Sequence, residues 1–332
     1  MIPSGRVASG EQNTLTVIAM IPAHNEEASI GEVIRRIPKS LDGCRVKILV
    51  VDDGSTDRTA AVAKENRADY VLSLGARRGL AKAFAAGLNK ALEQGAGIVV
   101  SIDADGQYDP EQIPQLIEPI VAGNADLVLG SRFAGWIEEM PIGKRIGNRI
   151  ATKLTSHLAG TSISDAQTGF RAFSREAVMK LNILGEYTYV QESLIQAARK
   201  NLRIWEIPVN FRKRVHGDSR LISSSFSYAR RAGLTMLRTY RDYRPFETFL
   251  AIGVILFVAG IAAGFRVLVH FFLTGQVSPF IPSAILSAVL LILGFQAMFL
   301  ALVADMLGRT RTLVEEVLYA VRSQQRKDRP EG

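Results

Sequence analysis

The amino-acid sequence predicts an α/β domain with an open, mostly parallel β-sheet, followed by a transmembrane hairpin of two helices. Short β-rich runs alternate with amphipathic helical stretches between Leu15 and about Pro208. Two long segments near the C-terminal end carry no Asp, Glu, Lys or Arg. The first pattern is typical of buried strands covered by helices, and each uncharged segment is long enough to cross a bilayer as a helix.

The predicted strands and helices follow one another along the chain. The runs VKILVV and IVVSI are almost continuously apolar, as expected for strands that are buried on both faces. Strands are predicted at residues 15–22, 46–52, 98–103 and 127–130. Helices are predicted at residues 28–37, 57–66, 79–94 and 112–122.

Acidic and polar residues follow three of these strands, as PAHNEE at 22–27, DDGSTD at 52–57 and DADGQ at 103–107. Ligands of open α/β sheets bind at the carboxyl ends of the strands. Carboxylates gathered there repel one another unless a cation or a hydrogen-bonding group lies between them. Asp103 and Asp105 suit a hard cation such as Mg²⁺ or Mn²⁺ that also binds diphosphate oxygens. The motifs therefore predict a nucleotide and a divalent metal at this edge.

The composition excludes several classes of protein. The chain has 332 residues, of which 48% are hydrophobic, 22% are charged and one is cysteine. These values exclude a disordered chain, a collagen-like repeat and a disulfide scaffold. Because Cys44 has no second cysteine to pair with, we expect the folded part to lie in a reducing compartment.

The transmembrane spans are predicted at residues 246–273 and 280–304. A buried hairpin of a soluble protein is the alternative, but such helices rarely lack a polar face over this length. The turn between the spans contains no Lys or Arg, whereas arginines flank the other ends, at positions 238, 241, 244, 309 and 311. The positive-inside rule then places both termini and the N-terminal domain in the cytoplasm.

The positive charge is concentrated before the first span. Residues 199–245 contain 12 Lys and Arg against 3 Asp and Glu, whereas the rest of the chain has a slight acidic excess. These cations can contact anionic lipid headgroups or a phosphorylated lipid. A nucleic-acid partner is not expected, because no nucleic-acid-binding motif accompanies the basic stretch.

The sequence is therefore divided into five regions: a flexible tail at 1–14, a catalytic domain at 15–221, basic juxtamembrane helices at 222–245, two transmembrane helices at 246–304, and an amphipathic helix with a tail at 305–332. The last helix either lies on the membrane or pairs with a neighbouring protomer. We expect a homo-oligomer.

Three further motifs are GSR at 130–132, SDAQTGFRAF at 164–173 and EIPVNFRKRVHGDSRL at 206–221. Together with the acidic motifs, they resemble family-2 glycosyltransferases of the GT-A fold. More narrowly, they are similar to the polyprenyl-phosphate glycosyltransferases typified by dolichol-phosphate mannose synthase. The resemblance covers about two thirds of the chain. One departure is His24, where the mannose synthases usually have a tyrosine. The residue at this position is the one expected to stack on the base of the nucleotide.

The resemblance implies a role for individual residues. Asp105 and Gln107, with Asp103 as a further candidate, would bind Mg²⁺ or Mn²⁺, and Asp53 is favoured over Asp52 as the residue that reads the base edge. The nucleotide-sugar site would comprise Pro22, His24, Glu26, Asp53, Asp103, Ala104, Asp105 and Gln107. The lipid phosphate would be bound by Arg132, Arg212, Lys213, Arg214 and Arg220. The catalytic residues would be Asp105, Arg132, Asp165 and Arg171.

The implied reaction is inverting transfer of a sugar from a UDP- or GDP-linked donor to a dolichyl or undecaprenyl phosphate at the cytoplasmic face of the membrane. A phosphate monoester has a second pKa of about 6, so its nucleophilic oxygen needs no general base at neutral pH. The alternative acceptor is a hydroxyl of a lipid-linked sugar, which would need a base. Asp165 and Glu192 are the candidates for that base. A non-catalytic scaffold is a third reading, which the acids and Gln107 disfavour.

Overall fold

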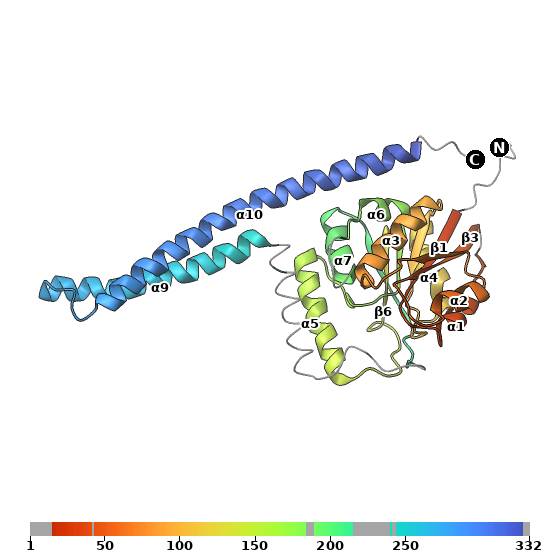
Figure 1. Cartoon of the computed structure of the whole chain (residues 1–332), viewed down its shortest axis with the longest axis horizontal. Helices are drawn as coiled ribbons and strands as arrows, with labels where there is room; N and C mark the ends of the chain where they lie inside the picture. Colours follow the sequence, from red (N-terminus) through yellow and green to blue (C-terminus); the bar gives the residue numbers. More distant parts are fainter. Residues whose placement is uncertain (1–14, 42, 184–188, 215–239, 241–243, 328–332) are drawn as a thin grey trace, which may run out of the picture. The chain divides into compact units, whose positions relative to one another are not determined.

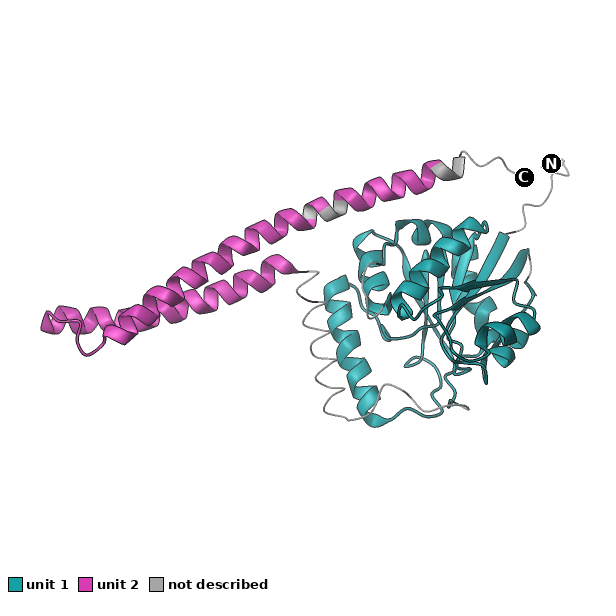
Figure 2. Cartoon of the chain, viewed as in Figure 1, with its two compact units in different colours: residues 1–222 teal, residues 223–332 magenta. Residues whose placement is uncertain are grey.

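The computed structural model describes residues 15–41, 43–183, 189–214, 240 and 244–327 (Figure 1). The chain divides into two compact units, residues 1–222 and 223–332 (Figure 2). The expected tail at 1–14, Arg220 and most of the expected juxtamembrane helices at 222–245 lie outside the described residues.

The first unit contains one mixed, mostly parallel sheet, as the sequence predicts. Its strands are β1 (Leu15–Ala23), β2 (Ser40–Leu41), β3 (Cys44–Asp52), β4 (Tyr70–Ser73), β5 (Ile98–Ser101), β6 (Leu127–Ser131), β7 (Arg171–Ser174) and β8 (Ile204–Pro208). The order is β2-β3-β1-β5-β7-β6-β8, and β4 also pairs with β3. Strands β4, β3, β1 and β5 run parallel to one another, whereas β7 runs antiparallel between β5 and β6.

Helices cover both faces of this sheet (Figure 1). They are α1 (Ile30–Arg36), α2 (Thr59–Glu65), α3 (Leu80–Glu93), α4 (Ile113–Val121), α5 (Ile142–Ala159), α6 (Arg175–Lys180) and α7 (Tyr189–Arg199), with a 3₁₀ turn at Pro110–Gln112. Alternate side chains of β1 point to opposite faces. Val17 and Ile21 pack with α1, α2 and α4, whereas Ile18 and Met20 pack with α3, α6 and α7. Two apolar cores therefore hold the sheet from both sides.

The predicted strands and helices are all present, with ends that shift by a few residues. The sequence interpretation missed β2, β4, β7, β8, α5 and α6. Strand β7 has only four residues and begins with Arg171, so its pattern is not that of an apolar strand. It is nevertheless buried, because it fills the gap between β5 and β6.

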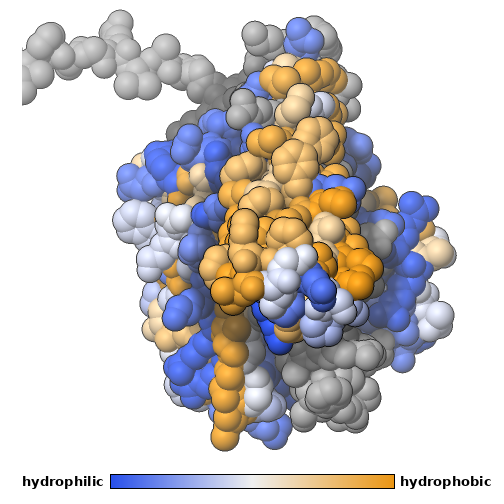
Figure 3. Space-filling model, turned by 90° about the vertical axis from the view of Figure 1, so that its left-hand side faces the viewer, coloured by the Kyte–Doolittle hydropathy of each residue, from blue (hydrophilic) through white to orange (hydrophobic). Residues whose placement is uncertain are grey.

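The second unit is a hairpin of two long helices, α9 (Pro245–Thr274) and α10 (Ile281–Lys327). Each helix contains an apolar segment long enough to cross a membrane. The expected spans lie within these helices, except that Phe280 precedes α10. Apolar side chains cover the outer surface of this hairpin (Figure 3). Such a surface is suited to lipid and not to water.

Small residues allow the two helices of the hairpin to pack closely. The Ser287 hydroxyl donates a hydrogen bond to the Gly260 carbonyl at 2.7 Å. A Cβ atom added at Gly253 would lie 2.9 Å from the Gly294 carbonyl oxygen, so the backbones almost touch there. Close approach at glycine and serine is the usual way in which helices associate in a bilayer.

Helix α10 continues far beyond the second expected span. The sequence places a separate amphipathic helix after residue 304, but the structure has one unbroken helix of 47 residues. At 1.5 Å per residue it is about 70 Å long, more than twice the hydrocarbon thickness. Proline is absent after Pro282 within this helix, so no residue interrupts its hydrogen-bonding pattern.

Candidate active site

The three acidic motifs meet at one edge of the sheet, because the strands that precede them are neighbours. Strand β1 pairs with β3 on one side and with β5 on the other. The Asp53 amide donates to the Ala23 carbonyl, and the Ile102 amide donates to the Met20 carbonyl. These bonds continue the parallel pairing up to the loops that carry His24, Asp53 and Asp103.

Two carboxylates at the end of β5 repel each other. Burial, and next the charge of Asp105, raise the pKa of Asp103 to about 7. Burial also raises the pKa of Asp105, although the Gln107 amide donates a hydrogen bond to its carboxylate at 3.1 Å. A Cβ atom at Gly169 would lie 2.6 Å from a carboxylate oxygen of Asp103, so only glycine leaves room there. This pair would gain from a cation placed between its members.

The residues at this position fit a divalent metal. Gln107 donates its Nε2 hydrogen to the Arg212 carbonyl at 3.2 Å, which leaves its amide oxygen for another partner. Two carboxylates and one amide oxygen suit Mg²⁺ or Mn²⁺, which commonly share their remaining positions with water and phosphate. Within the described residues, no group of three or more His, Cys, Asp or Glu side chains could hold a metal. A metal held by Asp103, Asp105 and Gln107 would need its remaining ligands from water or phosphate.

The loop after β3 holds the loop that leads into α3. The Asp53 carboxylate accepts hydrogen bonds from the amides of Arg78, at 2.6 Å, and Gly79, at 2.9 Å. His24 Nδ1 lies 2.9 Å from the Asp53 carbonyl oxygen. Asp52 instead bonds to the Ser55 amide and the Ser73 hydroxyl. Asp53 and His24 are thus brought together, and Asp52 has a local structural role.

The remaining expected nucleotide-site residues border the same edge. Pro22 and Ala104 are buried, at the end of β1 and between the two aspartates. Glu26 forms an ion pair with Arg214 at 2.5 Å, and another Arg214 nitrogen lies 4.0 Å from Asp105. Arg214, expected at the lipid phosphate, therefore lies beside the acids of the candidate metal site.

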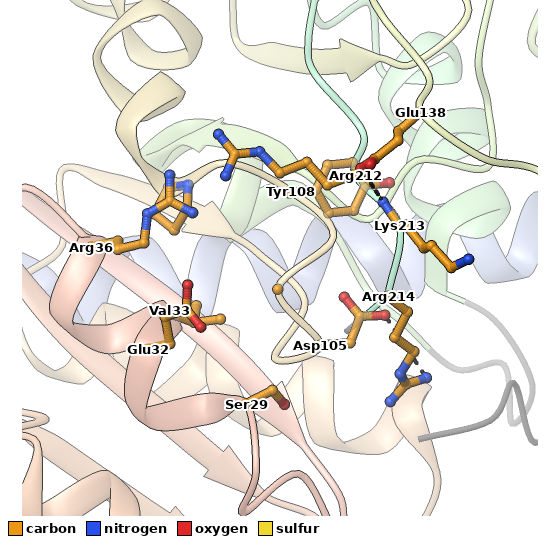
Figure 4. Close-up of a pocket in the computed structure, with 12 residues that line it drawn as sticks. Ser29, Glu32, Val33, Arg36, Asp105, Tyr108, Glu138, Arg212, Lys213 and Arg214 are labelled. Atoms are coloured by element: carbon orange, nitrogen blue, oxygen red, sulfur yellow. Dashed lines mark hydrogen bonds and ion pairs between the residues drawn. The ribbon is translucent and has the colours of Figure 1, made fainter. Parts of the chain in front are cut away.

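The neighbouring basic residues also contact acids. Arg212 pairs with Asp109 at 2.9 Å, and Lys213 pairs with Glu139 at 2.7 Å. A cavity of about 370 Å³ opens between α1 and this basic segment (Figure 4). Asp105 and Arg214 lie on one side of it and Arg36 on the other (Figure 4).

Arg132 follows β6 and is held by Asp165. Arg132 Nε and Nη2 donate to the two carboxylate oxygens at 2.7 and 2.8 Å, and the Arg132 amide donates at 3.1 Å. The guanidinium also lies over the Phe211 ring, 5.2 Å from its centroid. Because Asp165 is fully buried and both of its oxygens are engaged, the structure gives it a positioning role.

Arg171 is buried away from the cavity. Its guanidinium donates to the carbonyls of Ala166, Thr168 and Val190, at 2.9, 2.9 and 2.6 Å. Burial lowers its pKa to about 10. The arginine thus fixes the 164–170 loop against the start of α7, and its guanidinium nitrogens all donate to groups of this chain. Glu192, also on α7, is buried and accepts a hydrogen bond from Gln196 at 3.3 Å.

Lys144 is a candidate site residue, on electrostatic grounds, that the sequence interpretation missed. It lies on α5, and its pKa is lowered by burial and next by Arg132, while Asp105 and Asp103 oppose this shift. Its ammonium group thus shares the electrostatic environment of both the acids and Arg132. No local motif identifies it, because α5 lies between GSR and SDAQTGFRAF and was not predicted.

The fold and the acid-lined edge define a glycosyltransferase of the GT-A class with a membrane-spanning hairpin. The sequence matches Glycosyl transferase family 2 over residues 18–181 and the family 2 C-terminal transmembrane region over residues 224–308. The chain belongs to glycosyl transferase family 2.

Relatives of known name agree with this assignment. Polyprenol monophosphomannose synthase of Mycolicibacterium smegmatis is 30% identical over 227 residues, which is 65% of this chain and 84% of the relative. UDP-N-acetylglucosamine–dolichyl-phosphate N-acetylglucosaminyltransferase of Methanococcus voltae is 34% identical over 218 residues, 58% of this chain and 84% of the relative.

A solved structure shares the fold. Glucosyl-3-phosphoglycerate synthase from Mycobacterium tuberculosis, crystallised with Mn²⁺, UDP and phosphoglyceric acid, superimposes with a TM-score of 0.53 and 26% identity. The match covers 68% of this chain and 78% of that chain.

Proposed function

We propose that the protein transfers a sugar from a UDP- or GDP-linked donor to a polyprenyl phosphate, with inversion, at the cytoplasmic face of a membrane. One observation carries the proposal. Asp103 and Asp105, whose pKa values are raised, share one electrostatic neighbourhood with Arg132 and Lys144. Such a site offers acids for a metal-bound diphosphate and cations for a second phosphate. The names of the relatives support the lipid phosphate as acceptor.

Asp105 and Gln107, joined by Asp103, would hold Mg²⁺ or Mn²⁺. The metal would neutralise charge on the departing nucleoside diphosphate. Arg214 lies at the edge of this group, where its guanidinium can pair with a diphosphate in place of Glu26. The nucleoside would lie over His24 and Asp53, beside Pro22, Glu26 and Ala104.

The acceptor needs orientation more than activation. Above a pH of about 6 a phosphate monoester is mostly a dianion, so its oxygen is already nucleophilic. Arg132, fixed in place by Asp165, and Lys144 would align that oxygen behind the anomeric carbon. Direct displacement then inverts the anomeric centre. The engagement of both Asp165 oxygens with Arg132 argues against a base role for Asp165.

A transfer assay on the full chain tests this proposal. Purified protein is incubated with a panel of radiolabelled UDP- and GDP-sugars, a short polyprenyl phosphate and Mn²⁺ or Mg²⁺. We expect label in the lipid extract, and its loss on chelation or in Asp105→Ala. The same panel identifies the sugar and the nucleotide.

One outcome of the same assay would contradict the proposal. If the protein binds a nucleotide sugar but transfers label to no polyprenyl phosphate, the proposed acceptor is wrong. A hydroxyl acceptor would then be sought, and Glu192→Gln would be the first variant to test for a lost base.

A further inference from the structure

Helix α10 carries an apolar stripe after Asp305, which is the first charged residue of the helix. The apolar residues recur at spacings of three, four and seven, so they share one side of the helix. We call this side the extension stripe, and it consists of Leu307, Leu313, Val314, Val317, Leu318 and Val321. Each of these side chains is at least 42% exposed. A continuous apolar surface of this kind indicates that another molecule covers it.

Lipid does not cover the extension stripe, because this part of α10 leaves the bilayer. Residues 281–304 are about 36 Å long as a helix, which already exceeds a hydrocarbon thickness of about 30 Å. The helix continues unbroken to Lys327, about 35 Å further along the same axis. Membrane helices tilt by at most about 40°, so the end of α10 lies about 25 Å or more from the hydrocarbon. A helix that binds a membrane surface has its axis in the plane of the interface, and this one does not.

Helix α9 does not cover the extension stripe either. The two helices are antiparallel, and a Cβ atom added at Gly253 would lie 2.6 Å from the Met298 side chain. Pro245, where α9 begins, therefore lies at the level of the last residues of the second span. Figure 1 shows α10 continuing well past the start of α9. Among the described helices of the second unit, α10 alone extends to the level of the stripe.

The spacing of the stripe is that of a coiled coil. Leu307, Val314 and Val321 are seven residues apart, and Thr310 and Val317 follow the first two of them by three residues. These are the a and d positions of a heptad repeat. Two of the three a positions are valine, and β-branched residues at a favour parallel pairs of helices. The stripe is therefore suited to a second helix that runs in the same direction.

A second copy of this chain supplies such a helix. Its membrane span holds its own stripe at the same height above the bilayer and in the same direction, so the two stripes meet in register. Glu315, Glu316 and Arg322 fall at positions b and c of the heptad, outside the contact, so the pairing brings no like charges together. Anchorage of both copies in one membrane raises their effective concentration and favours a short contact.

We propose that residues 307–321 of α10 pair in parallel with the same residues of a second copy of this chain, outside the hydrocarbon of the bilayer. The sequence leaves two partners open for this stretch, the membrane surface and a neighbouring protomer, and the unbroken helix excludes the first. The family 2 transmembrane region ends at residue 308, so the pairing surface lies almost wholly beyond the matched part of the chain. The proposal does not rest on the proposed function.

The test compares cross-linking at two adjacent positions of α10. The full chain, with Cys44→Ser, receives Val317→Cys or Glu316→Cys and is reconstituted in liposomes at a low ratio of protein to lipid. Both residues are exposed, so random collisions reach them equally. In a parallel pair, residue 317 faces its counterpart at a distance that a disulfide can bridge, whereas residue 316 points away. We expect oxidation with copper phenanthroline to give several-fold more cross-linked dimer for Val317→Cys.

Two outcomes would overturn the proposal. Equal yields at the two positions would mean that the copies meet only by collision. Absence of cross-linking at both positions would mean that no second copy covers the stripe. A fluorophore on Val317→Cys would then show what does, since doxyl-labelled lipid quenches it in lipid and iodide quenches it in water. None of these measurements uses transferase activity, so this proposal can fail while the proposed function stands.

A charge placed in the contact gives a second test. Val321→Asp, added to the Val317→Cys protein, would bring two carboxylates together at an a position and should reduce cross-linking several-fold. The matched control is Ser323→Asp, which adds the same charge two residues away and off the stripe. If both substitutions reduce cross-linking equally, or if neither does, the extension stripe is not the contact between the copies.

Discussion

Arg132 and Asp165 are joined by two side-chain hydrogen bonds of 2.7 and 2.8 Å at a position where both residues are almost inaccessible, with 4% and 0% exposure. A buried ion pair is costly to break, because removal of one partner leaves the other charge without compensation. The pair therefore fixes the direction of the Arg132 guanidinium beside the acids of β5.

Asp165→Asn should destabilise the first unit and misplace Arg132. We expect the free energy of unfolding to fall by about 3–5 kcal/mol and transfer to the lipid acceptor to fall with it. Urea unfolding followed by tryptophan fluorescence measures the first effect, since Trp136 and Trp205 both lie in this unit.

The matched variant is Asp126→Asn. Asp126 pairs with Arg203 at 2.9 Å, but Arg203 is half exposed and keeps much of its hydration. Its loss of stability should be clearly smaller, with transfer activity retained. If both variants lose the same free energy of unfolding, burial of the Arg132–Asp165 pair does not make that pair contribute more to stability than the exposed pair does.

The pKa of Asp103, raised to about 7, predicts how metal binding depends on pH. A protonated carboxyl cannot bind a cation. Below pH 7, the Mn²⁺ affinity should therefore increase by about one order of magnitude for each unit by which the pH is raised, and it should be constant above pH 7. Titrations with Mn²⁺ followed by electron paramagnetic resonance measure this. Asp103→Asn should remove the dependence, and an unchanged slope in that variant would assign it to another group.

The same shift affects the metal-free protein in the opposite direction. Because the pKa of Asp103 is about 7 when folded and 3.8 in its ordinary state, the folded chain binds more protons between these values. The contribution of Asp103 to the stability of the metal-free protein is therefore fully present below a pH of about 4 and is lost as the pH rises through 7. Added Mn²⁺ should therefore stabilise the protein more at pH 8 than at pH 5, as measured by thermal unfolding.

Gly169→Ala should disturb the metal site without touching a ligand. The added methyl group would meet the Asp103 carboxylate at 2.6 Å and force it to move. We expect Mn²⁺ affinity to fall by about tenfold or more, as for other residues that orient ligands. The control is Gly143→Ala, where no atom lies within 4 Å of the added carbon. Wild-type Mn²⁺ affinity in Gly169→Ala would mean that Asp103 does not contribute to the cation site.

Lys144→Ala should weaken acceptor use selectively. Loss of a charged hydrogen bond to phosphate corresponds to about ten- to hundredfold in kcat/KM for the lipid. We expect the KM for the nucleotide sugar to change little and Lys144→Arg to restore much of the activity. A loss confined to the donor KM would instead place Lys144 at the diphosphate.

The sequence was sufficient for the parts of the fold that local patterns determine. Strands β1, β3 and β5 are apolar runs that are followed by acids, so both the strands and the position of Asp53 and Asp103 at the same edge of the sheet could be predicted. The pairing of Arg132 with Asp165 could not, because 33 residues separate them and only the packing of the sheet brings them together. Arg171 carries the same charge as Arg132, yet burial directs it to backbone carbonyls.

Helix α5 and Lys144 escaped prediction for a related reason. The apolar residues on the outer side of α5 blur the periodicity that marks an ordinary surface helix. Likewise, nothing in the sequence after residue 304 shows whether the amphipathic stretch starts a new helix or continues α10. A helix continues wherever no residue ends it, and the lack of a helix-ending residue is a weaker sequence signal than a capping residue or a proline.

The position of β7 fixes the distance between two loops of the candidate site. Since β7 separates β5 from β6, the loops that carry Asp103 and Arg132 start two strand spacings apart, which is about 9–10 Å. A sheet buried on both faces cannot easily change this interval. If one phosphate-bearing molecule bound at each loop, the spacing of the strands would keep the two molecules apart. The space between them would then hold the group that is transferred from one to the other.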